Sequence, residues 1–475
     1  MCLGGKGGLR DAASSASASA TEAAPAAVIW CVGTQFHESV WYPMPTLREQ
    51  GRPSVLSNRR VVELLLLILF GGWEPAHAMP AFPLHTQGAF IVDSEGHRVR
   101  LNGFSWYGAD STDYVVGGLQ AQRLSTLVRE IKGLGFNIVR LPWSNELYEH
   151  NPVVGKYALT ANPDMEGERA LEVMDEVVAA LREAGIMVIL DNHTSDAEWC
   201  CKNDGNNLWY NDRYPESSWI RDWKGMAKRY ANNPMVIGAD VRNEPRISAT
   251  WGGNSATDWH AAAERAGNAV LSANPSMLIF VEGIDYALDL SRVTALPVRL
   301  KKANRVVYEA HDYSFDHHGL TDYTSYVKDI TPKWGYLATG PNPTPLWIGE
   351  FGTCNTAKTC ITSTLPSDNG FWFNFLAMYV KQQHLDWAYW SINGTEATGA
   401  GRSYGKAESY GVLDSAWSGP SSSELTQRLK SLMSNVKRSQ RPATDRGSKP
   451  RKRWIDLARL REALFFDKAT SPCLP

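Results

Sequence analysis

The feature that most constrains the fold is an alternation, between about residues 101 and 436, of short apolar runs with longer helix-patterned segments. The run at 186–193 is typical, because it follows a helix-patterned segment at 167–184 and a single glycine, Gly185. The apolar runs are continuous, as in parallel strands that are buried on both faces. Eight such strands with intervening helices predict an α/β fold, the (β/α)8 TIM barrel.

The predicted elements follow one another without an internal repeat. We expect strands at 101–106, 136–143, 186–193, 277–282, 305–311 and 386–392 and in the runs that begin at 236 and 346. Helices are expected at 119–134, 167–184, 217–230, 257–273, around 323, at 371–383 and at 421–436. In front of the first barrel strand, Ala89–Val92 and Arg98–Leu101 predict a small amino-terminal β-hairpin, joined by a polar turn.

Glu244 and Glu350 each stand at the end of an apolar run that we expect to be a strand. The run from Val236 delivers Asn243 and Glu244 just before Pro245, which cannot continue a strand ladder. The run from Leu346 reaches Glu350 in the same way. Because the carboxyl ends of barrel strands meet at one mouth, we expect the two carboxyls to lie close together. A pair of carboxyl groups is what hydrolysis of a glycosidic bond requires.

Other polar residues also stand at predicted strand ends, and they come in recognisable motifs. The motifs are Ile-Val-Arg-Leu-Pro with Arg140, Asp-Asn-His with His193, Asn-Glu-Pro with Asn243 and Glu244, His-Asp-Tyr with His311 and Tyr313, Gly-Glu-Phe-Gly with Glu350, and Trp390. In these motifs, over roughly Ala81 to Val436, the chain resembles glycoside hydrolase family 5, the cellulase-like retaining β-glycosidases. The resemblance implies that Glu244 is the acid/base and Glu350 the nucleophile.

The expected surroundings of the two glutamates agree with that division. Arg140 near Glu350 would favour the charged carboxylate, and Tyr313 could donate a hydrogen bond to it. Glu244, beside another carboxylate in a partly dry cleft, should have a raised pKa and keep its proton for the leaving group.

The remaining site residues are expected to bind substrate. Asn243 can hydrogen-bond the sugar 2-hydroxyl, and His193 and His311 would orient substrate and carboxylates. Trp390 would form the floor beneath the sugar. Further tryptophans are either stacking platforms or packing residues: Trp143, Trp199, Trp209 and Trp251. The glycosylation sequons at Asn192 and Asn393 lie by the expected cleft, so we expect neither to be modified.

The predicted function is a secreted retaining glycoside hydrolase that cleaves a β-linked polysaccharide, foremost β-1,4-glucan. A β-mannanase and a β-glucosidase are alternatives, because loops decide which hydroxyls are contacted. A catalytically silent carbohydrate-binding barrel is the alternative outside enzymes, and the presence of both glutamates disfavours it. No cofactor is expected, and seven scattered cysteines without C-x-x-C pairs argue against a structural zinc site.

The expected partner is a polysaccharide or oligosaccharide. A net charge of −2 gives no electrostatic reason to expect nucleic acid or an anionic membrane. We expect a monomer.

The ends of the chain predict secretion to the extracellular space or cell wall. Residues 1–58 read as an unstructured or mis-annotated leader, with translation starting at Met44. Residues 59–78 read as a signal peptide, with Arg59-Arg60, a short apolar run and Ala76-His77-Ala78. That leaves a catalytic domain at 79–437, a basic tail at 438–475 that we expect to be disordered, and no membrane attachment after signal removal.

An oxidising compartment would allow disulfides among Cys200, Cys201, Cys354 and Cys360. Cys354 with Cys360 closes a short loop and is the pairing we favour.

Overall fold

The computed structural model of the chain describes residues 79–200 and 205–433. The predicted leader, signal peptide and basic tail, and Cys201, lie outside these ranges. Within the ranges, no helix combines the length and the apolar character that crossing a membrane requires.

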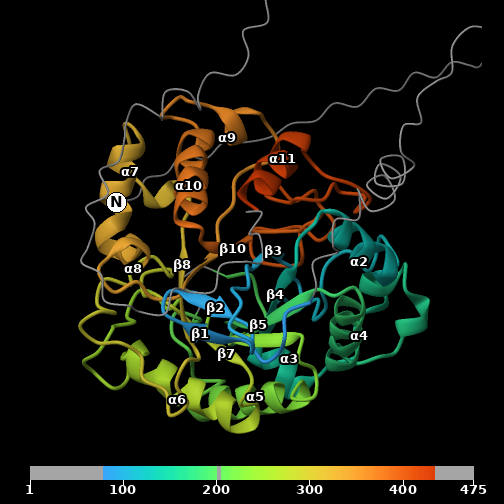
Figure 1. Cartoon of the computed structure of the whole chain (residues 1–475). Helices are drawn as coiled ribbons and strands as arrows, with labels where there is room; N and C mark the ends of the chain where they lie inside the picture. The colour runs from blue at the N-terminus through green and yellow to red at the C-terminus, as the bar shows by residue number, and fades with distance from the viewer. Residues whose placement is uncertain (1–78, 201–204, 434–475) are drawn as a thin grey trace, which may run out of the picture. The chain divides into compact units, whose positions relative to one another are not determined.

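Eight parallel strands close into a barrel in the order β10-β3-β4-β5-β6-β7-β8-β9, and helices surround it (Figure 1). The strands are β3 (Asn102–Ser105), β4 (Ile138–Ser144), β5 (Met187–Thr194), β6 (Val236–Asp240), β7 (Leu278–Glu282), β8 (Val306–His311), β9 (Leu346–Glu350) and β10 (Asp386–Tyr389). The predicted (β/α)8 TIM barrel is therefore confirmed.

The main helices coincide with the predicted helical segments. They are α2 (Leu124–Gly133), α4 (Ala170–Glu183), α5 (Glu216–Arg229), α6 (Trp259–Ala273), α7 (Tyr323–Ile330), α10 (Asn369–Gln383) and α11 (Ser423–Leu432). Short helices α3 (Asn145–His150), α8 (Tyr336–Thr339) and α9 (Thr359–Thr362) lie between them. Gly135 and Gly185, at φ of +89° and +71°, end the turns after α2 and α4 in the left-handed region that glycine adopts without strain.

The amino-terminal hairpin is present, but its strands differ from the predicted ones. It pairs β1 (His85–Gln87) with β2 (Phe90–Val92) around Gly88, whereas the predicted second strand contributes only a single bridge from Arg98 to Val92. The sequence at 85–87 lacks the alternation of apolar and polar residues that marks a strand, so sequence reasoning missed β1.

The hairpin closes one end of the barrel. Leu84, Ile91 and Leu101 share a buried apolar cluster with inward residues of the barrel strands, among them Ile189, Phe280, Val307 and Trp347. Because side chains on a strand alternate between faces, the residue two positions further along points inward one layer higher. Four of those next residues are polar or glycine: Asp191, Glu282, Glu309 and Gly349. The apolar end therefore gives way to a buried charged layer beneath the mouth.

Candidate active site

The two predicted glutamates lie together at the mouth of the barrel. Glu350 is the last residue of β9, and Glu244 follows β6. One oxygen of each carboxyl and one ring nitrogen of His311 all lie within 4.8 Å of one another. Glu244 is 6% exposed and Glu350 4%, so both carboxyls are nearly withdrawn from water.

Glu350 receives two strong hydrogen-bond donors. Arg140 Nη1 donates to its Oε1 at 2.6 Å, and the Tyr313 hydroxyl donates to its Oε2 at 3.0 Å. Burial raises the pKa of the Glu350 carboxyl, and the positive charge of Arg140 opposes the rise. Both donors favour the carboxylate, so the predicted contacts of Arg140 and Tyr313 with Glu350 are confirmed.

Glu244 has a different environment. Its Oε1 lies 3.0 Å from His311 Nδ1, and its backbone N–H donates to Glu282 Oε2 at 2.6 Å. Burial raises the pKa of the Glu244 carboxyl, with Arg246 the first group to oppose it. Its backbone φ of +47° is unusual for a glutamate and costs energy, as is common where a side chain must be aimed into a site.

Arg140, fully buried, sits at the centre of the charged layer. Its Nη1 lies 2.9 Å from Asp191, its Nε and Nη2 donate to Asp240 at 2.9 and 2.7 Å, and its Nη2 donates to Glu282 at 3.0 Å. Burial raises the pKa of Asp191 to about 7 and that of Asp240 to about 6, while Arg140 opposes both shifts.

Sequence reasoning did not select these buried carboxyls, nor Glu309 beside them. A signal existed for two of them, since Asp191 and Glu309 stand two positions before His193 and His311 and therefore share their inward face.

Three other predicted residues, His193, Asn243 and Trp390, contact further residues at the mouth, and their expected contacts with substrate stay predictions. His193 Nδ1 lies 2.7 Å from Asp191, and its ring stacks on Trp390 at 5.2 Å. Asn243 Oδ1 accepts from Arg140 at 2.9 Å. Trp390 also stacks on Tyr107, at 5.2 Å and 10° between planes, which sequence reasoning missed. His311, as expected, contacts one of the two glutamate carboxyls, that of Glu244, whereas His193 contacts Asp191.

Of the four further tryptophans, three are core residues. Trp143, Trp209 and Trp251 are at most 2% exposed, so none can stack on a sugar, and the packing alternative holds for them. Trp199 is half-buried and packs edge-on against Trp390, with the Arg402 guanidinium 3.8 Å above its ring. Trp199 therefore remains the candidate platform.

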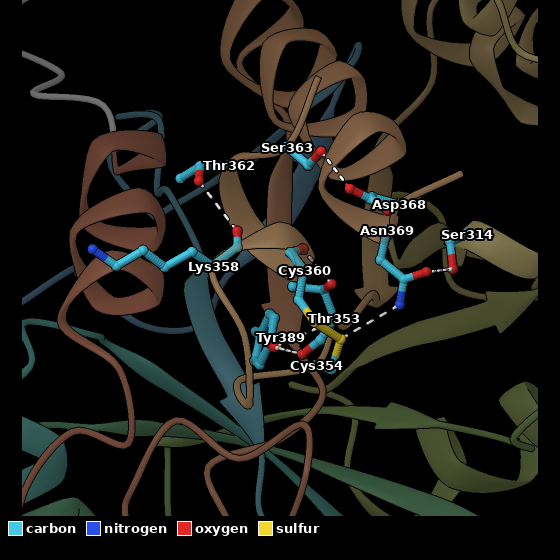
Figure 2. The surroundings of a disulfide bond; sticks show 10 residues. All are labelled: Ser314, Thr353, Cys354, Lys358, Cys360, Thr362, Ser363, Asp368, Asn369 and Tyr389. Atoms are coloured by element: carbon cyan, nitrogen blue, oxygen red, sulfur yellow. Dashed lines mark hydrogen bonds between the residues drawn. A yellow bond between two sulfur atoms is a disulfide. The ribbon is translucent and has the colours of Figure 1, made fainter. Parts of the chain in front are cut away.

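The segment after Glu350 is fastened by the favoured disulfide. Figure 2 shows the bond between Cys354 and Cys360, which confirms the predicted pairing. Thr353 donates from Oγ1 to the Cys360 carbonyl at 2.6 Å, and the Tyr389 hydroxyl donates to the Thr353 carbonyl at 2.9 Å. The strand end that carries Glu350 is thereby tied to β10.

Cys200 is disulfide-bonded, and its Sγ lies 3.5 Å from Glu244 Oε2. Asn192 and Asn393 are fully buried, so neither side chain could accept a glycan in this fold.

One further cluster has residue types that ligate metals. Asp93, Glu95 and His97 lie in the turn after β2, and Asp93 Oδ1 accepts hydrogen bonds from the backbone N–H groups of the other two at 3.0 and 2.8 Å. These hydrogen bonds account for the cluster as a structured turn.

Comparison with known proteins identifies a family match across the barrel. Residues 92–396 match the family model Cellulase (glycosyl hydrolase family 5). The chain is 36% identical over 356 residues to an endoglucanase of Paenibacillus polymyxa, covering 70% of this chain and 86% of that protein. It is 31% identical over 325 residues to the major extracellular endoglucanase of Xanthomonas campestris pv. campestris, covering 64% and 63%.

Solved structures of two such enzymes are also similar to this chain. The catalytic domain of the major Xanthomonas campestris endoglucanase superposes with a TM-score of 0.63 at 28% identity, covering 74% of this chain and 99% of that one. An endocellulase of Pyrococcus horikoshii, in complex with cellotetraose, gives a TM-score of 0.63 at 27% identity, covering 75% and 100%.

Proposed function

Because the chain belongs to glycosyl hydrolase family 5, a family of O-glycosyl hydrolases, we propose that it cleaves β-1,4-glucan internally, with retention of anomeric configuration. Glu350 is the proposed nucleophile and Glu244 the proposed acid/base. Arg140, His193, Asn243, His311, Tyr313 and Trp390 are the proposed substrate-binding and supporting residues.

The observation that carries the stereochemistry is the short distance between the two carboxyls. Retaining enzymes place these groups about 5–5.5 Å apart, whereas inverting enzymes need about 6.5–9.5 Å to hold the attacking water between the general base and the sugar. One oxygen of Glu244 and one of Glu350 lie within 4.8 Å of each other, which supports the shorter separation of a retaining site. Double displacement through a glycosyl-enzyme is therefore the mechanism that the geometry supports.

In the first step, a Glu350 oxygen attacks the anomeric carbon while the bond to the leaving oxygen breaks. That oxygen keeps the electron pair and takes the proton from Glu244. In the second step, water attacks the same carbon, its proton passes to Glu244, and Glu350 leaves as the carboxylate. Arg140 and Tyr313 stabilise that carboxylate in the free enzyme. Their hydrogen bonds to it weaken as the carboxylate loses its negative charge during the attack.

The two glutamates can be distinguished with an activated aryl cellobioside and azide. Glu244→Gln should lose polysaccharide hydrolysis by a factor of about 10²–10⁴. It should still form the glycosyl-enzyme from the aryl substrate, because a good leaving group needs no proton. Azide should then accelerate turnover and give a β-glycosyl azide, since a small anion needs no general base.

Glu350→Gln should lose activity on every substrate, and azide should give no product of retained configuration. Equal losses in both variants on the aryl substrate, with no azide effect, would refute the assignment of roles. Proton NMR of the first product from unmodified enzyme should show the β-anomer before mutarotation, and an initial α-anomer would exclude retention.

The names of the relatives support β-1,4-glucan as the substrate, since the Paenibacillus polymyxa and Xanthomonas campestris proteins are called endoglucanases. A panel of soluble cellulose derivative, β-mannan and cellobiose, with reducing-end detection, tests this choice. Faster cleavage of mannan would favour the β-mannanase alternative, and cleavage of cellobiose alone would favour a β-glucosidase.

Secretion and domain limits are proposed on the sequence pattern at residues 59–78 and on the extracellular naming of one relative. We expect a monomeric catalytic domain at 79–437. Expression from Met44 in a eukaryotic host should release protein that begins near Met79, as amino-terminal sequencing would show. Cytosolic protein with its first residues intact would contradict this.

A further inference from the structure

Glu309, on β8, is a buried carboxyl that the scheme above does not use. Its side chain is fully inaccessible, and neither of its oxygens makes a hydrogen bond to a described residue. Its Oε1 lies 3.5 Å from Arg140 Nε and 3.5 Å from His311 Nε2. Gly349 makes the space for this carboxyl, since a Cβ there would lie 1.5 Å from Glu309 Oε1.

The surroundings of Glu309 favour its protonated, neutral form. A carboxylate without strong hydrogen bonds is very costly to bury, so such groups take up a proton instead. Burial raises the pKa of Glu309 well above its usual range, and the negative charge of Asp240 raises it further, against the opposing charge of Arg140. A neutral carboxyl has one O–H to donate.

The neighbouring imidazole of His311 carries one ring proton, which can lie on Nδ1 or on Nε2. Burial lowers the pKa of His311 to about 3, so the ring is neutral, with an N–H on one nitrogen and an acceptor on the other. Nδ1 lies 3.0 Å from Glu244 Oε1. Nε2 makes no hydrogen bond to a described residue, and faces Glu309 Oε1 and Glu282 Oε1 at 3.5 Å each, the outer limit for a hydrogen bond.

The two acids favour opposite tautomers of His311. Burial raises the pKa of Glu282 as well, but its oxygens already accept hydrogen bonds, Oε1 from Arg140 Nη2 at 3.0 Å and Oε2 from the Glu244 backbone N–H at 2.6 Å. Its Oε1, which faces Nε2, therefore acts as an acceptor and favours a proton on Nε2. The O–H of Glu309 favours a bare Nε2 that can accept. The choice between them decides whether Nδ1 donates to Glu244 or accepts from it.

We propose that Glu309 is a positioning residue for the acid/base: it donates its O–H to His311 Nε2, which places the ring proton on Nδ1 and directs it at Glu244 Oε1. The proposal rests on the proposed role of Glu244. With Oε1 accepting, the acid proton of Glu244 resides on Oε2. It passes from there to the glycosidic oxygen, which keeps the electron pair of the breaking bond. The Nδ1–H then stabilises the new carboxylate. In the opposite tautomer, Nδ1 would hold the Glu244 proton on Oε1.

A matched pair of variants tests the donor. Glu309→Leu removes the O–H at similar volume, whereas Glu309→Gln replaces it with an N–H that can still donate to Nε2. The measurement is kcat/KM for aryl cellobiosides of graded leaving-group pKa, with thermal unfolding as the control for folding.

Glu309→Leu should lose about tenfold or more on poor leaving groups, a part of the roughly 10²–10⁴ that a general acid supplies, and much less on a dinitrophenyl leaving group. Its dependence on leaving-group pKa should therefore steepen. Glu309→Gln should retain the slope of the unmodified enzyme, because it restores the donor. A loss of equal size on all leaving groups in Glu309→Leu would overturn the proposal and leave only a packing role.

The tautomer itself can be observed in the unmodified enzyme, so the test does not depend on a variant folding. With ¹⁵N-labelled histidine, and His311 assigned by its loss in His311→Gln, Nδ1 should show the pyrrole-type shift and Nε2 the pyridine-type shift. The reverse pattern would refute the proposal. Azide rescue of Glu244→Gln is independent of Glu309, so its presence with the reverse tautomer would defeat this inference alone, whereas its absence would defeat the role of Glu244.

Discussion

Replacing Arg140 with lysine keeps a positive charge in the barrel but removes the separate N–H donors of the guanidinium. The guanidinium donates to Glu350 at 2.6 Å from one side and to Asp240 at 2.7–2.9 Å from the other. A lysine has a single nitrogen and cannot make both contacts. Because Arg140 Nε, the nitrogen next to the aliphatic stem, donates to Asp240, we expect the ammonium to stay with Asp240 and Glu350 to lose its cation.

The expected size of the effect follows from the loss of one short, charge-assisted hydrogen bond in a buried site. An adjacent arginine lowers a carboxyl pKa by about 1–3 units, so the pKa of Glu350 should rise by about that amount in Arg140→Lys. Each unit corresponds to about 1.4 kcal/mol and to a tenfold smaller ionised fraction below the pKa. At a pH below the Glu350 pKa of the unmodified enzyme, kcat/KM should therefore fall by about 10- to 1000-fold, and it should recover as the pH rises.

The assay is a pH profile of kcat/KM on the activated aryl cellobioside, for which Glu244 protonation matters least. The acidic limb should move to higher pH. Arg100→Lys is the matched control, because Arg100 is also buried and pairs with Asp386 at 2.6 Å, at the start of β10 and away from the mouth. If the acidic limb stayed in place in Arg140→Lys, or moved equally in Arg100→Lys, Arg140 would not control the ionisation of Glu350.

Two more predictions concern the layer beneath the site and the pH dependence of stability. Gly349→Ala should lower activity and the melting temperature, because the added Cβ would lie 1.5 Å from the Glu309 carboxyl. Gly133→Ala is the control, since a Cβ at this position of α2 would have no atom within 4 Å, and it should leave activity unchanged. Similar losses in both variants would contradict the clash. Burial alone would lower the pKa of His317, but Asp312 and Asp329 outweigh it and raise the pKa to about 9 from 6.5. This stabilisation, about 3 kcal/mol, should be fully present below about pH 6.5 and lost as the pH rises through about 9. Denaturant titrations at several pH values should show a loss that His317→Gln lacks, and an identical loss in the variant would count against the pair.

The barrel and the two glutamates were predictable because their signals are local. A continuous apolar run, followed at once by a polar residue and then by proline or glycine, marks a buried strand and its end within ten residues. Glu244 and Glu350 both carry that mark, and the barrel rule then brings strand ends together without any knowledge of loops. Arg140 and Tyr313 followed from the same rule, and the structure places both against Glu350.

The tryptophans show where that reasoning stops. Trp143 stands at a strand end, as Trp390 does, and Trp209 lies in the loop after β5, yet both pack against tryptophans of α5 and are fully buried. A tryptophan is as suited to a core as to a sugar platform, and only the path of the following loop decides between them. Sequence gives that path poorly.

The buried carboxyls were missed for a different reason: an acid within an apolar run looks like an interruption of the strand. Their meaning depends on a residue from another strand, Arg140, whose charge is costly to bury unless several acids surround it. Glu309 depends most on residues outside its own position, because Gly349 on β9 leaves the space for its carboxyl and His311 on its own strand is its neighbour. The period-2 rule can nominate two of these residues, since Asp191 and Glu309 each lie two positions before a mouth histidine and point the same way. It cannot assign their protonation, which depends on how many acids share one guanidinium. The chemistry of the mouth therefore depends on the buried carboxyls around Arg140. The sequence can locate members of this layer, but only the assembled barrel determines which of them are charged.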